Sequence, residues 1–131
     1  MKNHSFSKEE RIKLKKDFEL IYSAGKRVRS GNRKLKALFV LKNSEISGIK
    51  IAVAVHKRAG KAFWRNRVKR LLRESYRLNK EILVSKCEEN KQLLVVFSLN
   101  TINQKKFPKP QLEDVYSDVV DIMKQISKSI Y

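Results

Sequence analysis

The apolar run within residues 92–99 is the feature that most constrains the fold. It contains five consecutive apolar residues, Leu93, Leu94, Val95, Val96 and Phe97. Because successive side chains of a strand point to opposite faces, a strand made of these residues must be covered on both faces. We therefore predict a central β-strand here, in a sheet against which helices pack.

Three helices are predicted from apolar residues that recur three and four positions apart. The first covers about residues 15–24, where Phe18, Ile21 and Tyr22 share one face and Gly25 follows as a C-cap. A long basic helix covers about residues 61–80, and a last helix follows a loop with two prolines. The inner stripe of the long helix is Trp64, Val68, Leu71, Leu72 and Ser75, and the apolar face of the last helix is Leu112, Val115, Tyr116, Val119, Ile122, Met123 and Ile126.

Residues 35–41 and 49–55 are predicted strands because they are apolar and rich in β-favouring side chains. The polar segment 43–48 between them is typical of a hairpin loop. Val28 fits a short basic strand, and residues 7–10 fit a capping box that starts a helical turn. The predicted order is a helix, two or three strands, a long basic helix, a strand and a helix. This is an α+β sandwich with helices against one sheet.

A chain of 131 residues fits one domain, which we place over residues 1–131 with a flexible N-terminus over about residues 1–10. The chain carries 31 Lys and Arg against 13 Asp and Glu, a formal charge of +18. Such a charge favours a polyanionic partner, because each neutralised phosphate releases condensed counterions. Nucleic acid is the first candidate, and an anionic membrane surface is the second.

The sequence indicates a cytoplasmic protein. No apolar run approaches the roughly 18 residues of a membrane span, and the first ten residues are polar and charged, unlike a secretory signal. The single cysteine, Cys87, excludes an internal disulfide and is read as a bystander thiol.

The positive charge is densest between His56 and Arg77, where nine Lys and Arg accompany one acidic residue, Glu74. On a helix, Arg65, Lys69 and Arg73 form a stripe with four-residue steps, a row of cations able to engage successive phosphates. A solvated helix face normally mixes charge signs to gain ion pairs, which these cations lack. A helix lying on a membrane would need its apolar face free, whereas this one is needed for the core.

The segment Val55–Arg73 reads Val-His-Lys-Arg-Ala-Gly-Lys-Ala-Phe-Trp-Arg-Asn-Arg-Val-Lys-Arg-Leu-Leu-Arg. It resembles the signature of the protein subunit of bacterial ribonuclease P, which has a basic pair, a Gly, an Ala and then Arg-Asn-Arg-x-Lys-Arg. A second match lies upstream in Leu14–Gly25, which resembles the family's Leu-Lys, Asp-Phe, aromatic and Gly pattern. The order of helices and strands agrees along about 110 residues. His56 and Trp64 depart from the residues common in the family.

The resemblance implies an α-β-β-β-α-β-α two-layer sandwich with a left-handed crossover between two parallel strands, against the general right-handed rule. It also implies that the basic segment contacts the catalytic RNA. The residues expected there are Lys57, Arg58, Lys61, Arg65, Asn66, Arg67, Lys69, Arg70 and Arg73.

A separate cleft between the first helix and the sheet is expected, by resemblance, to take the single-stranded 5′ leader of precursor tRNA. Phe18 and Tyr22 match the family's aromatic positions, and Ala37 and Phe39 are placed opposite them on a strand. Aromatic residues stack on unpaired bases with little sequence preference, and nearby cations hold the backbone. From spacing alone, the alternative that Phe18, Tyr22 and Phe39 are core residues stays open, although the cleft is favoured.

We predict no catalytic residue and no metal site in the polypeptide. A protein ribonuclease needs paired His or grouped carboxylates, but the two histidines, His4 and His56, are far apart in sequence. The resemblance implies that the RNA subunit of the endoribonuclease holds catalytic Mg²⁺ while the protein assists removal of the leader in tRNA 5′ maturation. The expected partners are ribonuclease P RNA and precursor tRNA, with no membrane and no small-molecule substrate. The alternative is a basic ribosomal or ribosome-assembly RNA-binding protein.

Overall fold

A computed structural model describes residues 8–130 and contains one four-stranded sheet in the order β1-β2-β4-β3. The strands are β1 (Lys26–Arg29), β2 (Leu35–Asn43), β3 (Gly48–Ala54) and β4 (Lys91–Leu99). β4 runs antiparallel to β2 and parallel to β3. The apolar run thus lies in a strand that is paired on both sides, which confirms the predicted central strand.

The predicted hairpin between β2 and β3 is wrong. The two strands are not neighbours, because β4 lies between them. The connecting loop instead passes the start of β4, where the Ser44 amide donates to the Asn90 carbonyl oxygen over 3.0 Å and the Asn90 amide donates to Ser47 Oγ over 2.9 Å. β4 takes the central position because its side chains are apolar on both faces.

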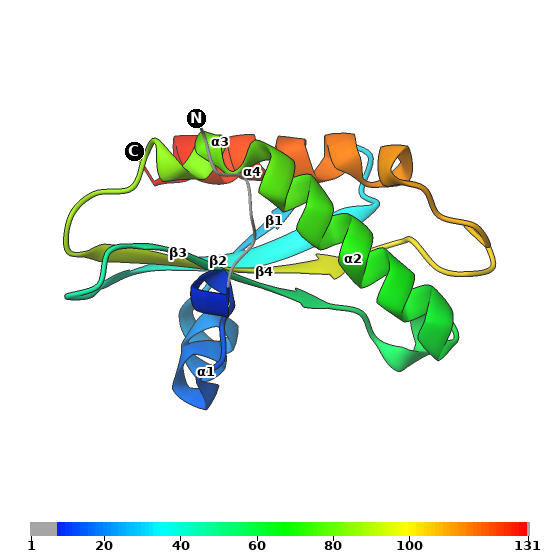
Figure 1. Cartoon of the computed structure of the whole chain (residues 1–131), viewed down its shortest axis with the longest axis horizontal. Coiled ribbons are helices and arrows are strands. Elements are labelled where there is room, and N and C mark those ends of the chain that lie inside the picture. The colour runs from blue at the N-terminus through cyan, green and yellow to red at the C-terminus, as the bar shows by residue number, and fades with distance from the viewer. Residues whose placement is uncertain (1–7, 131) are drawn as a thin grey trace.

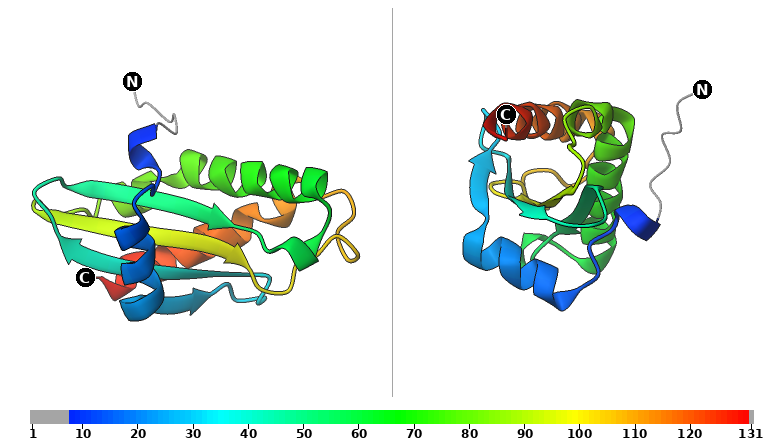
Figure 2. Two further views of the ribbon diagram at one scale, coloured as in Figure 1. Left: turned by 90° about the horizontal axis from the view of Figure 1, so that it is seen from below. Right: turned by 90° about the vertical axis from the view of Figure 1, so that its left-hand side faces the viewer.

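Helices cover both faces of the sheet (Figures 1 and 2). The helical elements are η1 (Lys8–Glu10), α1 (Lys15–Ala24), η2 (Lys57–Ala59), α2 (Ala62–Asn79), α3 (Glu81–Val84), η3 (Leu112–Asp114) and α4 (Tyr116–Ser129). Figure 1 shows α2 and α4 on one side of the sheet and α1 on the other. The three long predicted helices are therefore confirmed, and α3 is an additional short turn.

The two faces of β4 belong to different cores. Leu93, Val95 and Phe97 pack in the larger cluster with α2 and α4, and Leu94 and Val96 pack in the smaller cluster with α1. The α+β class is confirmed, but the predicted two layers become three. The reason is that α1 is itself amphipathic and covers the second apolar face of β4.

Two contacts fix α1 and the segment before it against the sheet, and a glycine ends the helix. Lys42 Nζ on β2 lies 2.9 Å from Asp17 Oδ1, and the Asp17 side chain is only 4% exposed. The Ile12 amide donates to the Ile51 carbonyl oxygen over 3.0 Å just before the helix begins. Gly25 caps the helix as predicted, donating to the Ile21 carbonyl oxygen over 2.8 Å. A Cβ at Gly25 would collide with that same oxygen, so the position needs glycine.

Two predictions remain untested: the hand of the crossover between β3 and β4, and the cap of the first helical turn. The strands β3 and β4 are parallel and joined through α2, and the left-handed sense of this crossover stays a prediction. The predicted helical turn corresponds to η1, but its proposed cap, Ser7, and most of the predicted flexible N-terminus lie outside the described residues. η1 itself is anchored, because Lys80 Nζ lies 2.8 Å from Glu10 Oε1.

Candidate nucleic-acid interface

Helix α2 turns its apolar residues inward and leaves a cationic outer face. Trp64, Val68 and Leu72 are at most 1% exposed and pack in the larger core, as predicted. Because these residues lie three and four apart, the opposite side of the helix is left to solvent. The predicted RNA contacts that are exposed on η2, at the start of α2 and on its outer face are Lys57, Arg58, Lys61, Asn66, Arg67 and Arg70.

The other three predicted RNA contacts, Arg65, Lys69 and Arg73, lie on one flank of α2 and are half-buried. Arg65 Nε donates to the Gly60 carbonyl oxygen over 3.1 Å. Lys69 and Arg73 border two hollows that also include residues of β3 and of the segment 11–22. The predicted stripe therefore exists, but it faces the edge of the sheet as well as solvent.

The start of α2 is locked by Gly60 and by the loop before α4. The Lys61 amide donates to Gln104 Oε1 over 2.8 Å, and the Gln104 amide donates to the Ala59 carbonyl oxygen over 2.7 Å. A Cβ at Gly60 would lie 2.7 Å from Trp64 Cε3 and 2.9 Å from Gln104 Cβ. Glycine is needed here because the backbone passes directly against these two side chains.

Arg67 and Trp64 hold the same loop from further along the helix. Trp64 Nε1 donates to the Phe107 carbonyl oxygen over 2.7 Å, which gives the buried indole its partner. Arg67 Nε donates to the Pro110 carbonyl oxygen over 2.7 Å, and its Nη2 donates to Gln111 Oε1 over 3.2 Å. The Arg67 guanidinium is thus held in a fixed orientation at the surface.

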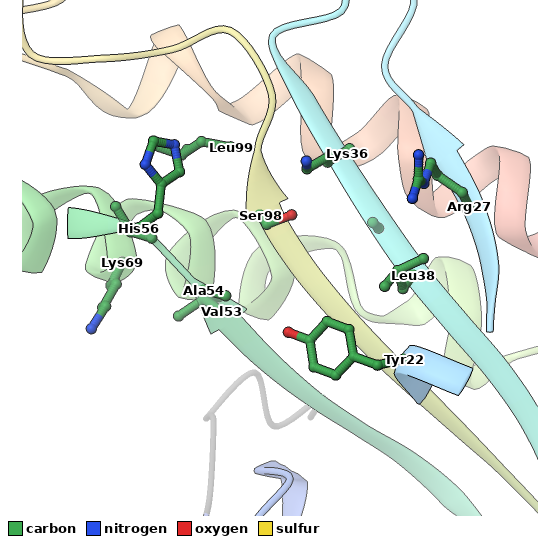
Figure 3. A pocket seen from close by; sticks show the side chains of 12 residues that line it. Tyr22, Arg27, Lys36, Leu38, Val53, Ala54, His56, Lys69, Ser98 and Leu99 are labelled. Carbon is green, nitrogen blue, oxygen red and sulfur yellow. The ribbon is translucent and has the colours of Figure 1, made fainter. Parts of the chain in front are cut away.

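A cleft of about 560 Å³ lies where α1, the sheet and α2 approach one another. Figure 3 shows the Tyr22 ring on α1 at one end and His56 and Lys69 at the other, with Ser98 on β4 between them and Lys36 on the neighbouring strand β2. The cleft therefore combines an aromatic side chain with cations from α1's side of the sheet and from α2.

The two aromatic residues predicted on α1 face two adjacent hollows. Tyr22 is 61% exposed and lines the large cleft. Phe18 is half-buried and lines a smaller hollow of about 210 Å³ together with Arg11 and Arg73. Each hollow thus has one aromatic residue of α1 and at least one cation of α2.

Of the two β2 residues predicted in this cleft, Ala37 is among the residues that line it, but the placement of Phe39 is wrong. Their side chains are 0% and 3% exposed and belong to the core beneath α2 and α4, on the opposite face from α1. Side chains alternate along β2, so a choice of phase that is wrong by one residue assigns the whole set to the wrong face.

The prediction missed the cleft residues on the β2 face that points toward α1, and those on the other strands around the cleft. They are Arg27, Lys36, Leu38, Val53, Ala54, Val55, His56, Ser98 and Leu99. A signal was present, because Lys36 is the only charged residue between Leu35 and Leu41. A lone lysine in an apolar strand indicates the face with access to solvent.

Charge is concentrated where α2 meets the smaller hollow. Burial, and secondly the neighbouring Arg11, lower the pKa of Arg73. Further along α2, Arg77 Nε donates to Glu74 Oε2 over 2.9 Å, and this hydrogen bond lowers the pKa of Glu74. The one acidic residue of α2 thus pairs with Arg77, so the unneutralised part of the helix ends near Arg73.

Within residues 8–130, no three His, Cys, Asp or Glu side chains are grouped to hold a metal ion. His56 lies at the rim of the cleft with Lys69, while His4 lies outside the described residues. Burial raises the pKa of the half-buried Cys87 thiol, which makes it a weak nucleophile. None of the helices between residues 8 and 130 has the length and apolar character to span a bilayer.

Comparison with known proteins matches the chain to one family. The model of the family described as Ribonuclease P matches residues 6–126. A ribonuclease P protein component of Clostridium botulinum (strain 657 / Type Ba4) is 35% identical over 118 residues, covering 90% of this chain and 95% of the relative. The Macrococcus caseolyticus protein component is 40% identical over 74 residues, covering 56% and 62%. The solved structure of the Thermotoga maritima RNase P protein aligns with a TM-score of 0.66 at 24% identity, covering 88% of this chain and 96% of that one.

Proposed function

The chain belongs to the ribonuclease P protein family, and we propose that it binds the RNA subunit through α2 and the 5′ leader of precursor tRNA through the cleft beside α1. Membership makes it the protein subunit of a tRNA-processing endoribonuclease whose partner is ribonuclease P RNA. Beyond family membership, we propose three points. The substrate leader binds in the cleft, the residues named below make the RNA contacts, and the described residues act as one RNA-binding domain.

The observation that carries the leader assignment is the large cleft. Its Tyr22 ring is 61% exposed, and Arg27, Lys36 and Lys69 lie around the same hollow. An exposed ring stacks on an unpaired base of any sequence, and surrounding cations hold the phosphates that connect successive bases. A single-stranded leader supplies both groups, whereas the mature tRNA end lacks them.

The outer face of α2 is assigned to the RNA subunit. Asn66 and Arg70 are exposed there, and the exposed Lys57, Arg58 and Lys61 continue the surface over η2 and the start of the helix. A row of cations along a rigid helix suits the regular spacing of phosphates. Lys69 belongs to both surfaces because it lines the cleft from α2. The leader and the RNA subunit would therefore meet along this helix.

Mg²⁺ is assigned to the holoenzyme and mainly to its RNA. A protein with a formal charge of +18 repels divalent cations but neutralises phosphates, so it lowers the repulsion between leader and RNA subunit. Reduced repulsion lets the RNA keep its metal ions at lower free Mg²⁺. We place the complex in the cytoplasm, where precursor tRNA is made.

Cleavage of precursor tRNA by ribonuclease P RNA, with and without this protein, tests the function. At low Mg²⁺ the protein should raise the cleavage rate, and it should favour substrate with a leader over mature tRNA in binding. No stimulation over RNA alone would exclude the function.

Variants of α2 test the assignment of surfaces. Arg70→Ala should weaken binding of the RNA subunit and reduce the dependence of log affinity on log salt by under about one unit. Lys124→Ala on the exposed part of α4 is the matched control and should change neither quantity. Equal effects of the two substitutions would mean that only the total charge matters.

A further inference from the structure

An exposed aromatic residue without an assigned role lies on α2, beside the cations assigned to the RNA subunit. Phe63 is 67% exposed and lies one helical turn before Arg67, so their side chains are neighbours on the helix surface. The cleft-lining Lys69 projects from a different side of α2. Exposure of a large apolar ring to water is unfavourable, and it is relieved when the ring stacks on a nucleic-acid base whose phosphates bind the neighbouring cations.

The loop before η3 brings further cations to the same end of α2. Residues 100–111 include Lys105, Lys106 and Lys109, all exposed, and no Asp or Glu. None of these lysines takes part in a salt bridge within residues 8–130. Their charge is therefore available to an external anion.

The loop is held rigidly against the helix. Gln104, Phe107 and Pro110 are bonded to the start of α2 through Lys61, Trp64 and Arg67, as described above. On its other side, Lys34 Nζ lies 5.1 Å from the centre of the Phe107 ring and 3.2 Å from the Asp114 carbonyl oxygen. The backbone that carries the lysines is thus ordered before any ligand arrives, which lowers the entropy lost on binding.

We propose that Phe63 and the loop 105–109 form an additional RNA-binding site, in which an unpaired base of ribonuclease P RNA stacks on the Phe63 ring while the loop lysines bind adjoining phosphates. The inference rests on the proposed function, since it extends the α2 surface assigned to the RNA subunit. A polyanionic RNA is favoured over a protein partner because loop 100–111, which carries the three exposed lysines, contains no Asp or Glu. The RNA subunit is preferred to the leader because Phe63 and the cleft lie on different sides of α2.

Binding of ribonuclease P RNA in the absence of tRNA tests the site. Phe63→Ala should weaken binding about five- to a hundredfold, the range expected for loss of one base–aromatic stack, and Phe63→Tyr should restore it. Replacement of Lys105, Lys106 and Lys109 by Gln should reduce the salt slope by up to about three units. The matched controls are Ile46→Ala, which removes another apolar side chain that is 70% exposed, and the paired substitution of Lys124 and Lys128 by Gln.

The outcomes separate this site from the proposed function. If Arg70→Ala weakens RNA binding while Phe63→Ala and the lysine variant do not, the additional site is wrong and the function stands. If Phe63→Ala affects only the preference for substrate with a leader, the ring binds the leader and our assignment to the RNA subunit is wrong. If the unchanged protein fails to stimulate cleavage, the function itself fails.

Discussion

At the scale of the residue, Gly60 shows how one missing side chain positions an interface. We predict that Gly60→Ala lowers the free energy of unfolding by about 1–3 kcal/mol, the usual penalty of overpacking. The added Cβ would press on the Trp64 ring and on Gln104, so the start of α2 and the docked loop must move. Urea unfolding measures the effect. Gly31→Ala is the control, because its Cβ would meet only Asp121 Oδ2 at 3.5 Å; equal losses would refute the explanation.

Tyr22 and Phe18 differ at the same scale because of their burial. Since the Tyr22 side chain is 61% exposed, Tyr22→Ala should change the stability by no more than about 0.5 kcal/mol. It should nevertheless reduce the preference for precursor over mature tRNA, measured as a ratio of dissociation constants. Unchanged preference would remove Tyr22 from the leader site. Phe18→Ala is a less clean test, since Phe18 is half-buried against the smaller core.

At the scale of the element, the position of α1 depends on its buried ion pair with β2. We predict that Asp17→Ala destabilises the protein by about 1–3 kcal/mol, because Lys42 loses a hydrogen-bonded charge partner in a poorly solvated site. The leader preference should fall as α1 loosens, while binding of the RNA subunit persists. The control on the same helix is Glu19→Ala, whose pair with Lys15 spans 3.9 Å between side chains that are 91% and 67% exposed. That pair should contribute under about 1 kcal/mol, so a matching loss would contradict the role of Asp17.

The same elements show what the sequence could predict. The inner stripe of α2 was predictable because apolar residues and cations fall on opposite sides of one helix. It was not predictable which β2 side chains face α1, because both faces of this strand are covered and nearly all of its side chains are apolar. Phe39 packs in the larger core, whereas its neighbour Leu38 packs against the smaller one. The separation of β2 from β3 was equally hidden, since it depends on the insertion of β4, about forty residues later in the chain. Loop 100–111 could not be placed at the start of α2 from sequence, because Phe107 and Pro110 accept hydrogen bonds from α2 through their carbonyl oxygens, which every residue type carries.

At the scale of the whole molecule, net charge should affect folding and binding in opposite directions. The formal charge of +18 destabilises the compact free protein by self-repulsion, and salt screens that repulsion beyond about 10 Å at 0.1 M. Raising NaCl from about 50 to about 200 mM should therefore increase the free energy of unfolding, measured with urea so that the denaturant is uncharged. Over the same range the affinity for ribonuclease P RNA should fall about 10³–10⁵-fold if six to ten phosphates are contacted.

Comparing the salt dependence of stability in a less charged variant and in the natural chain distinguishes screening of self-repulsion from specific binding of ions. The variant with Lys105, Lys106 and Lys109 replaced by Gln has a formal charge of +15 against +18 for the natural chain. Because less repulsion is left to screen, its stability should rise less steeply with salt, and its stability at low salt should be equal or higher. A steeper rise in the variant would mean that anions bind specifically elsewhere on the folded protein. A stability that falls with salt would show that the cations are offset by native ion pairs, contrary to the sparse pairing of α2.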